Sequence, residues 1–213
     1  MAGGASVDLG FVEPMLRRRL SPLARVTLCA AHDCVQDVEQ FRFVYASRHG
    51  EIARTTSMLE SLADKESLSP TVFGLSVLNA VTGLFSILLK NTEPATAISA
   101  GCASFGYGLM EASLQLASYP EQPVLYVYSD ELVPAVYGDC NPPESRIHAV
   151  ALLLDTSATT RISCDTTDSP VPESSEIQSY AFLRALQQGA SEWCGAGRQW
   201  SWSRSGDSKD GTC

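Results

Sequence analysis

Cys102 has the setting in this chain that most favours covalent chemistry. A short apolar strand is expected at 95–99, Ala100-Gly101 forms a tight turn, and a helical pattern covers 103–118. The thiol then stands at a helix N-terminus, where free N–H groups and the helix dipole lower the pKa of a thiol. This pattern predicts a candidate nucleophile. The alternative is a small apolar residue at the turn, because free cysteines are among the most buried residue types.

Polar side chains after other predicted strands are candidates for assisting such a thiol. His49 and the pair Asp130-Glu131 each follow an expected strand, at the carboxyl ends where α/β proteins tend to keep their sites. The alternatives are a structural histidine and solvated carboxylates. His32 lies on an expected helix and His148 in an expected buried strand, and both fit structural roles better.

Two classes of site find no support. Cys29 and His32 share a helical face that Cys34 does not, and no second group of ligand residues is present. The glycines around Cys102 do not match the dinucleotide fingerprint, and no Walker lysine follows a glycine-rich loop. We therefore expect no metal and no cofactor.

Alternating strands and helices must position these residues. The helix over 51–65 places Leu59 and Leu62 on its apolar side, and 76–89 is apolar on nearly every side, which predicts an element buried all round. The alternation predicts an α/β domain with layered helices around a mixed, mostly parallel sheet. The other expected elements are helices at 22–34, from Ser69-Pro70, at 103–118 and at 173–189, strands at 41–46, 95–99, 123–129 and 147–155, and a loop at 156–170.

The composition describes a globular chain of one domain. It has 213 residues, of which 45% are apolar and 18% charged, and its net charge of −9 argues against nucleic acid as a partner. Residues 1–54 carry a net charge of +1 and the remainder −10, so an anion-docking patch is expected near the amino end. Arg17, Arg18 and Arg19 are the candidates, and a solvated cluster is the alternative reading.

The same composition bears on the compartment. Residues 1–14 lack the apolar core of a signal peptide, and the longest apolar run, Val81 to Leu89, is too short to span a bilayer. Seven cysteines at irregular spacing do not describe a disulfide framework. We expect a cytoplasmic protein without a membrane span.

A longer block of the sequence resembles the amino-terminal half of β-ketoacyl synthases. A Ser-Pro-x-x-Phe start leads to a buried Asn-Ala-x-x-Gly helix, and a proline then precedes a strand and a cysteine with small residues after it. The residues that carry the resemblance are Ser69 to Phe73, Ser76 to Ala80, Gly83, Pro94 and Ser99 to Ser104. By this spacing Cys102 falls at the nucleophile position of the family.

The resemblance is closer to short ketosynthase-like proteins of the thiolase-like superfamily, which include the chain-length-factor-like subunits of aryl polyene pigment clusters. It covers most of 15–204, and implies a divergent or flexible segment at 1–14 and a disordered tail at 205–213. The matching stretches are RRRLSPLAR at 17–25, ASRHGE at 46–51, the segment 67–87, GLMEA at 108–112 and Trp200-Ser201-Trp202.

The chain also departs from the family. Leu78 stands where the short branch commonly has histidine, and residues 1–14 do not supply the opening strand of the family. The second half, which supplies two histidines in a full ketosynthase, is not expected in a chain of this length. The resemblance therefore implies a half-sized thiolase-like fold that is not catalytic alone.

What the resemblance implies is an accessory, chain-length-factor-type subunit of a type II ketosynthase. It would pair with a full-length ketosynthase through the strand at 95–99 and limit the acyl tunnel. Separately, the charge asymmetry makes Arg17 to Arg19 a candidate docking site for an acidic acyl carrier protein. The candidate tunnel-lining residues are Phe73, Leu84, Phe85, Phe105 and Tyr107, for which core packing is the alternative.

Two other functions remain open from the sequence. One is a stand-alone acyltransferase in which Cys102 accepts an acyl group from a carrier protein. The other is a self-associating scaffold, in which a second copy of the chain takes the place of the ketosynthase.

Overall fold

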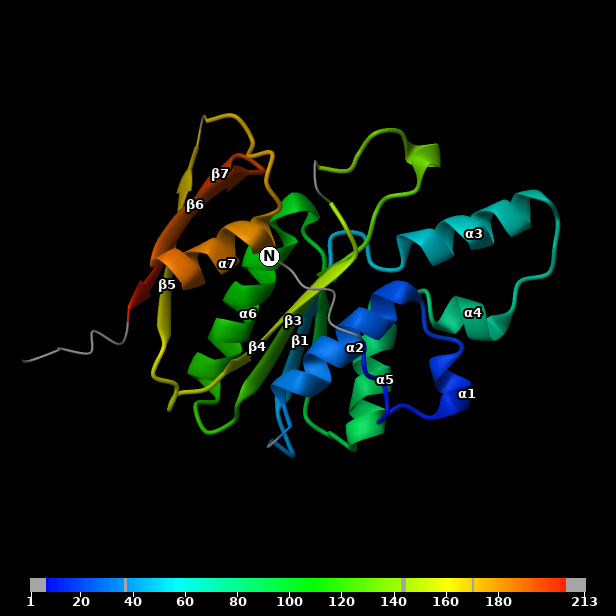
Figure 1. Cartoon of the computed structure of the whole chain (residues 1–213), viewed down its shortest axis with the longest axis horizontal. Helices are drawn as coiled ribbons and strands as arrows, with labels where there is room; N and C mark the ends of the chain where they lie inside the picture. Colours follow the sequence, from blue (N-terminus) through cyan, green and yellow to red (C-terminus); the bar gives the residue numbers. More distant parts are fainter. Residues whose placement is uncertain (1–6, 37, 143–144, 170, 206–213) are drawn as a thin grey trace, which may run out of the picture.

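The computed structural model describes residues 7–36, 38–142, 145–169 and 171–205 (Figure 1). Helices and strands alternate through the first two thirds of the chain, and strands dominate the last third. The helices are α1 (Pro14–Arg17), α2 (Pro22–Cys34), α3 (Ile52–Ala63), α4 (Pro70–Gly74), α5 (Ala80–Leu89), α6 (Ser104–Ser118) and α7 (Gln178–Gln188), with single turns of 3₁₀ helix at Gly101–Ala103 and Ala135–Tyr137. The strands are β1 (Arg42–Ala46), β2 (Ala95–Ile98), β3 (Val124–Asp130), β4 (His148–Leu154), β5 (Arg161–Asp168), β6 (Ala190–Gly195) and β7 (Arg198–Ser205).

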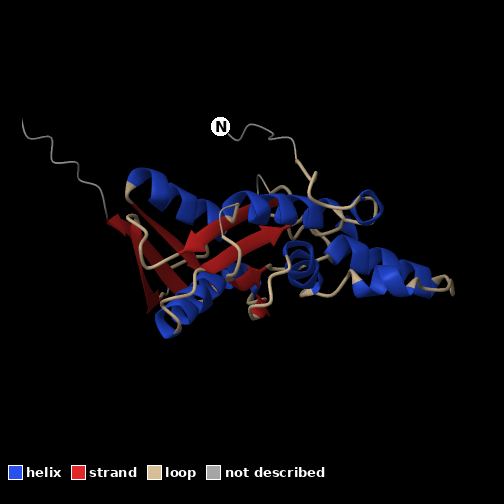
Figure 2. Ribbon diagram, turned by 90° about the horizontal axis from the view of Figure 1, so that it is seen from below, coloured by secondary structure: helices blue, strands red, loops and turns tan. Residues whose placement is uncertain are grey.

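The central sheet, sheet A, is mixed and mostly parallel. Its strand order is β2-β1-β3-β4; β1 is parallel to both of its neighbours, and β4 is antiparallel to β3. Figure 2 shows helices on both sides of the strands. The predicted fold class is confirmed.

A second sheet packs on the far side of α6 and α7. Sheet B has the order β5-β7-β6 and is antiparallel throughout. Figure 1 shows the layers from left to right as sheet B, then α6 and α7, then sheet A, then α2 and α5. The prediction of a loop at 156–170 is wrong, because β5 occupies most of it. Its side chains are mostly polar, and their alternation is too weakly apolar to indicate a strand.

Side chains on the two faces of sheet A form two separate cores. Val124 and Tyr126 of β3 point to α6 and α7, where Phe105, Phe182, Trp200 and Trp202 complete the packing. Leu125 and Val127 point the opposite way, to α2 and α5. This alternation follows from the two-residue period of a strand.

Two glycines allow α6 to lie between the sheets. A Cβ at Gly108 would come within 2.6 Å of the Cβ of Ala46 in sheet A, and a Cβ at Gly106 within 2.6 Å of the Trp200 ring in sheet B. Any larger residue at either position would separate α6 from one of the sheets. The spacing Gly-x-Gly is therefore a packing feature here.

Most predicted elements are confirmed, and two burial predictions are wrong. α5 is buried on one side only, because Ile87 is 77% exposed. The apolar side of α3 is also uncovered, since Leu59 and Leu62 are both exposed. Helical periodicity shows which apolar residues share one side of a helix. It does not show whether another part of this chain covers that side.

The predictions for the two ends of the chain can be compared with the structure only where it describes them. Leu9 and Val12 are buried, so the described part of 1–14 packs against the core. Residues 7–41, apart from the undescribed residue 37, contain no strand, so the opening strand of the resemblance is not found there. The predicted tail at 205–213 lies outside the described residues apart from Ser205, the last residue of β7.

Among the described residues, no helix combines the length and the hydropathy that crossing a membrane requires.

Candidate functional site

A cavity of about 300 Å³ lies at the carboxyl ends of β1 and β3, beside the start of α6. The turn after β1 contributes His49, β3 contributes Asp130, and β4 contributes His148. Cys102 also lines it and is partly exposed. The fold thus brings together the predicted thiol, the predicted histidine and both residues of the predicted acid pair, Asp130 and Glu131.

A defined turn holds Cys102. Gly101 has a positive φ of 59°, a backbone conformation that favours glycine. The Ser104 hydroxyl accepts a hydrogen bond from the Ala100 amide at 2.8 Å and donates one to the Gly101 carbonyl at 2.7 Å. One side chain therefore closes the turn on both sides of the cysteine, as the strand–turn–helix pattern predicts.

Burial shifts the pKa of several groups in the cavity, among them Asp130 and His49. It raises the pKa of Asp130 to about 6, although the backbone amides of His49 and Glu131 donate to this carboxylate and act in the opposite direction. Burial lowers the pKa of His49, and the neighbouring Arg48 lowers it further. His49 is thus a neutral imidazole at neutral pH, and its buried Nε2 has no hydrogen-bond partner among the described residues.

His148 is fully engaged in structural contacts. Its Nδ1 lies 3.0 Å from the Arg146 carbonyl and must donate to it, so Nε2 accepts from the Ser179 hydroxyl at 3.0 Å. The rings of Tyr128 and Tyr180 flank it at centroid distances of 5.6 and 5.0 Å. The interpretation of a structural histidine is supported.

The cavity brings a thiol close to a neutral base without joining them. Among the described residues, no hydrogen bond connects Cys102 to His49, His148 or Asp130. No group of three or more metal-ligating side chains is found among the described residues either. The arrangement suits a partly exposed thiol that an acyl group can reach, but it is not an assembled catalytic pair.

The predicted tunnel-lining residues do not meet in one cavity. Phe85 and Phe105 are fully buried on opposite faces of sheet A, where they pack as core residues. Tyr107 packs edge-on against Trp200 at 5.1 Å. Phe73 is 58% exposed on α4, and Leu84 lies beside Leu78 in a narrow cleft under α5. Only Phe73, Leu84 and Tyr107 remain accessible to a partner.

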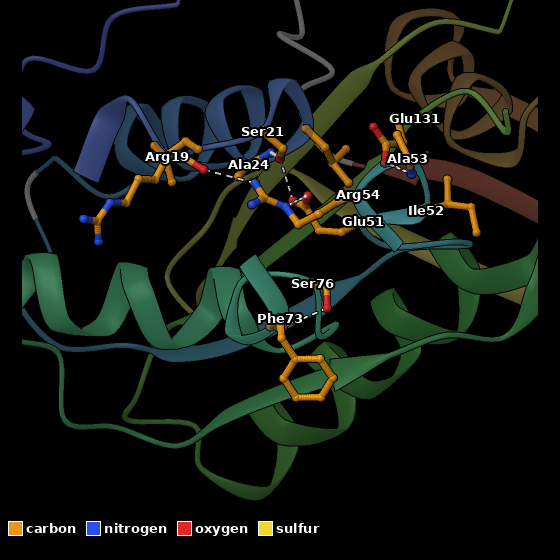
Figure 3. A network of polar contacts seen from close by, with 12 residues as sticks. Arg19, Ser21, Ala24, Glu51, Ile52, Ala53, Arg54, Phe73, Ser76 and Glu131 are labelled. Carbon is orange, nitrogen blue, oxygen red and sulfur yellow. Dashed lines mark hydrogen bonds and ion pairs between the residues drawn. The ribbon is translucent and has the colours of Figure 1, made fainter. Parts of the chain in front are cut away.

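The predicted arginine cluster also divides into one residue held by the fold and two exposed residues. Arg17 turns back and donates to the Val12 carbonyl at 2.9 Å, and its Nε is buried. Arg18 and Arg19 are exposed. Figure 3 shows the side chain of Arg19 extending away from its neighbours. The free cations near the amino end are therefore those two.

A polar network fixes the start of α3 (Figure 3). The Glu51 carboxylate accepts from the Ser21 hydroxyl at 2.6 Å and from Arg54 Nε at 3.1 Å. Arg54 also donates to the Arg19 carbonyl, and the Ala53 amide donates to Glu131 at 3.0 Å. Glu131 of the predicted acid pair thus anchors α3 and, like Asp130, also lines the cavity.

One edge of sheet A is open. Among the described strands, only β1 pairs with β2, which ends the sheet on that side. The helices packed against β2 are α5 and α6, and they expose Ile87 and Leu114. We call β2, with the exposed Ile87 of α5 and Leu114 of α6, the β2 surface. It contains the strand that the sequence singled out for pairing.

Sequence reasoning missed the contribution of the last third of the chain. Gln178 of α7 accepts from the Gly106 amide at 2.8 Å and lines the Cys102 cavity. The alternating buried tryptophans of β7 were the available signal, because Trp200 and Trp202 stand two residues apart on one face of a strand.

Comparison with known proteins identifies a matching family and many similar solved structures. Residues 1–203 match the family described as β-ketoacyl synthase, N-terminal domain. A search of curated proteins finds no match. A chain from the complex of the ketosynthase ApeO with its chain length factor ApeC, from Xenorhabdus doucetiae, is 32% identical with a TM-score of 0.82. The match covers 94% of this chain and 84% of that one, so the two chains have similar lengths.

Two more distant structures share the fold. A chain of the ishigamide ketosynthase/chain length factor is 14% identical with a TM-score of 0.64, over 87% of this chain and 59% of that one. A β-ketoacyl synthase from Burkholderia phymatum is 13% identical with a TM-score of 0.59, over 86% and 56%. This chain therefore spans less than two thirds of those longer chains.

Proposed function

The chain belongs to the β-ketoacyl synthase N-terminal domain family, and from this premise we propose that it is a chain-length-factor-type accessory subunit that pairs with a full-length ketosynthase. The similar chain in the ApeO–ApeC structure comes from an assembly of this kind. The proposed pathway is type II, polyketide or fatty-acid-like, of the aryl polyene class, and the proposed compartment is the cytoplasm.

The open edge of sheet A carries the proposal. The carbonyls of Pro94 and Ile98 accept hydrogen bonds from β1, so the alternate residues Ala95 and Ala97 direct their N–H and C=O groups outward. An apolar edge strand left uncovered invites pairing with another chain. A ketosynthase edge strand, added at β2, would satisfy these groups and cover Ile87 and Leu114.

Co-expression with a ketosynthase encoded beside this chain tests the proposal. Size exclusion should show one heterodimer peak that contains both chains. Ala95→Lys places a charge on the outward edge of β2 and should abolish co-elution. Ala97→Pro removes an outward N–H while keeping the pairing with β1, and should do the same.

Ala190→Lys is the matched control, because Ala190 is also exposed and also begins an edge strand, β6 of sheet B. It should leave the heterodimer intact. A ketosynthase that fails to co-elute with the unchanged chain would contradict the proposal. A dimer of this chain alone that Ala95→Lys breaks would support the scaffold function instead.

Within this function, accessible side chains would limit the partner's acyl tunnel. The candidates that are not fully buried in the core are Phe73, Leu84 and Tyr107. The exposed Arg18 and Arg19 would attract an acidic acyl carrier protein.

Acyl transfer by Cys102 is the second candidate function. The observation that favours it is the partly exposed thiol in a cavity that also holds a neutral His49. Incubation with an acyl-carrier thioester, followed by intact mass measurement, should then show an adduct that Cys102→Ala loses. The absence of an adduct with every carrier tested would exclude this activity.

A further inference from the structure

A second cavity, larger than the Cys102 cavity, lies on the side of α6 that faces β4 and β5. It has a volume of about 560 Å³ and lies between α6, α7, β4 and β5. β4 is the edge of sheet A opposite to β2. The site therefore stays accessible when a partner covers β2, and an inference about it does not depend on the proposed function.

The wall of this cavity is mainly apolar, and most of its apolar side chains are aliphatic. It follows α6 from Gly106 to Leu116, a length of about 15 Å at the usual helical rise. The side chains along it are only partly buried, so they are not filled in by the neighbouring core. They are Leu109, Leu116, Leu152, Leu154, Ile162 and Leu186. Apolar ligand sites have volumes of this order.

The charged side chains in the lining indicate which polar group a ligand of this cavity would carry. Arg161 is exposed, and among the described residues that line the cavity it is the only cationic one. The single acid of the lining, Asp155, already accepts from the amide and the hydroxyl of Ser157. An exposed arginine in the lining of a mainly apolar cavity suits a carboxylate on an alkyl chain.

We propose that this cavity binds an unbranched, medium-length fatty carboxylate, with the alkyl chain along α6 and the carboxylate at Arg161. The lining follows α6 from Gly106 to Leu116, which suits a linear chain. The proposal concerns binding alone.

Calorimetric titration of the full chain with dodecanoate tests the proposal. Ser113 and Ser118 form a matched pair on α6, because both are exposed and each hydroxyl donates to the carbonyl four residues earlier, but only Ser113 lines the cavity. Ser113→Trp should weaken binding by about tenfold or more, and Ser118→Trp by less than about twofold. Circular dichroism checks that each variant is folded.

Arg161→Glu tests the head group, with Arg204→Glu as its control on the neighbouring strand β7. The first change should weaken dodecanoate binding by about tenfold, and the second should have little effect. Dodecylamine should bind more weakly than dodecanoate. The proposal is overturned if dodecanoate does not bind the unchanged chain, if Ser118→Trp weakens binding as much as Ser113→Trp, or if dodecylamine binds as tightly.

Discussion

The outer face of sheet B and the β2 surface are both exposed, but they are built from opposite kinds of residue. The outward side chains of sheet B are polar, and Ser163, Asp165 and Thr167 face Ser203, Ser201 and Gln199 across the strand pair. On the β2 surface, Ile87 is 77% and Leu114 59% exposed. Sheet B thus ends the layered stack in a form that water tolerates, and the β2 surface does not.

This difference shows which of the two surfaces needs no further polypeptide to cover it. The inward face of sheet B packs Trp200 and Trp202 against α6 and α7, so its polar outer face needs no further layer. The β2 surface offers outward backbone groups and exposed apolar side chains together. The natural reading is that a second polypeptide supplies the neighbours missing from this side.

Removal of a tryptophan from the inner face of sheet B should have the largest effect. Trp200 is fully buried and contacts Tyr107 and Trp202. Trp200→Ala should lower the free energy of unfolding by about 4 kcal/mol. Urea denaturation measures this, with Ser201→Ala on the opposite face as the control, expected within about 0.5 kcal/mol. Equal effects would mean that sheet B is not an integral layer.

Between these two regions lies the Cys102 cavity, where pH should act. Burial raises the pKa of Asp130 from its usual 3.8 to about 6, so the folded chain binds more protons than the unfolded chain between these values. The contribution of Asp130 to the free energy of unfolding is therefore most favourable below pH 3.8. This contribution is lost as the pH rises through about 6. Asp130→Asn should remove this pH-dependent loss in the free energy of unfolding, which is on the order of 2 kcal/mol.

The difference in stability between the unchanged chain and Asp130→Asn, followed by urea denaturation across this pH range, isolates the contribution of Asp130. His49 has a lowered pKa and acts in the opposite direction, but it contributes to both proteins. A difference that does not vary with pH would show that the carboxylate is solvated.

Self-association of the isolated chain should depend on the β2 surface alone. Ile87→Ser removes its most exposed apolar side chain and should reduce association in light scattering, while the free energy of unfolding changes by less than about 0.5 kcal/mol. Val171→Ser is the control, because Val171 is also exposed but lies in the loop after β5. If both changes act alike, the β2 surface has no special role.

Reversal of charge at Arg18 and Arg19 should have the smallest effect. Exposed ion pairs contribute little individually, so each change to glutamate should weaken the binding of an acidic carrier protein by only a few fold. Fluorescence anisotropy at two salt concentrations measures this. Arg204→Glu, an exposed arginine on sheet B, should leave carrier binding unchanged, and an equal loss there would contradict a docking role for the amino end.

The sequence predicted the central sheet and the position of Cys102 because their signals are local. Ser21 before Pro22 caps α2, and Gly101 takes the positive φ of the turn. The sequence did not predict sheet B, because β5 carries almost no apolar period. It also placed the uncovered side of α5 in a core, since Ile87 and Phe85 are equally apolar in the sequence. Which face a partner covers depends on residues outside this chain.

Hydrogen–deuterium exchange of the chain with and without its co-expressed ketosynthase tests the central claim most directly. The amides of Ala95 and Ala97 point outward and should exchange rapidly in the free chain and slowly in the complex. Peptides from the outer strands of sheet B should exchange equally in both states. Protection of sheet B with no change at β2 would contradict the account.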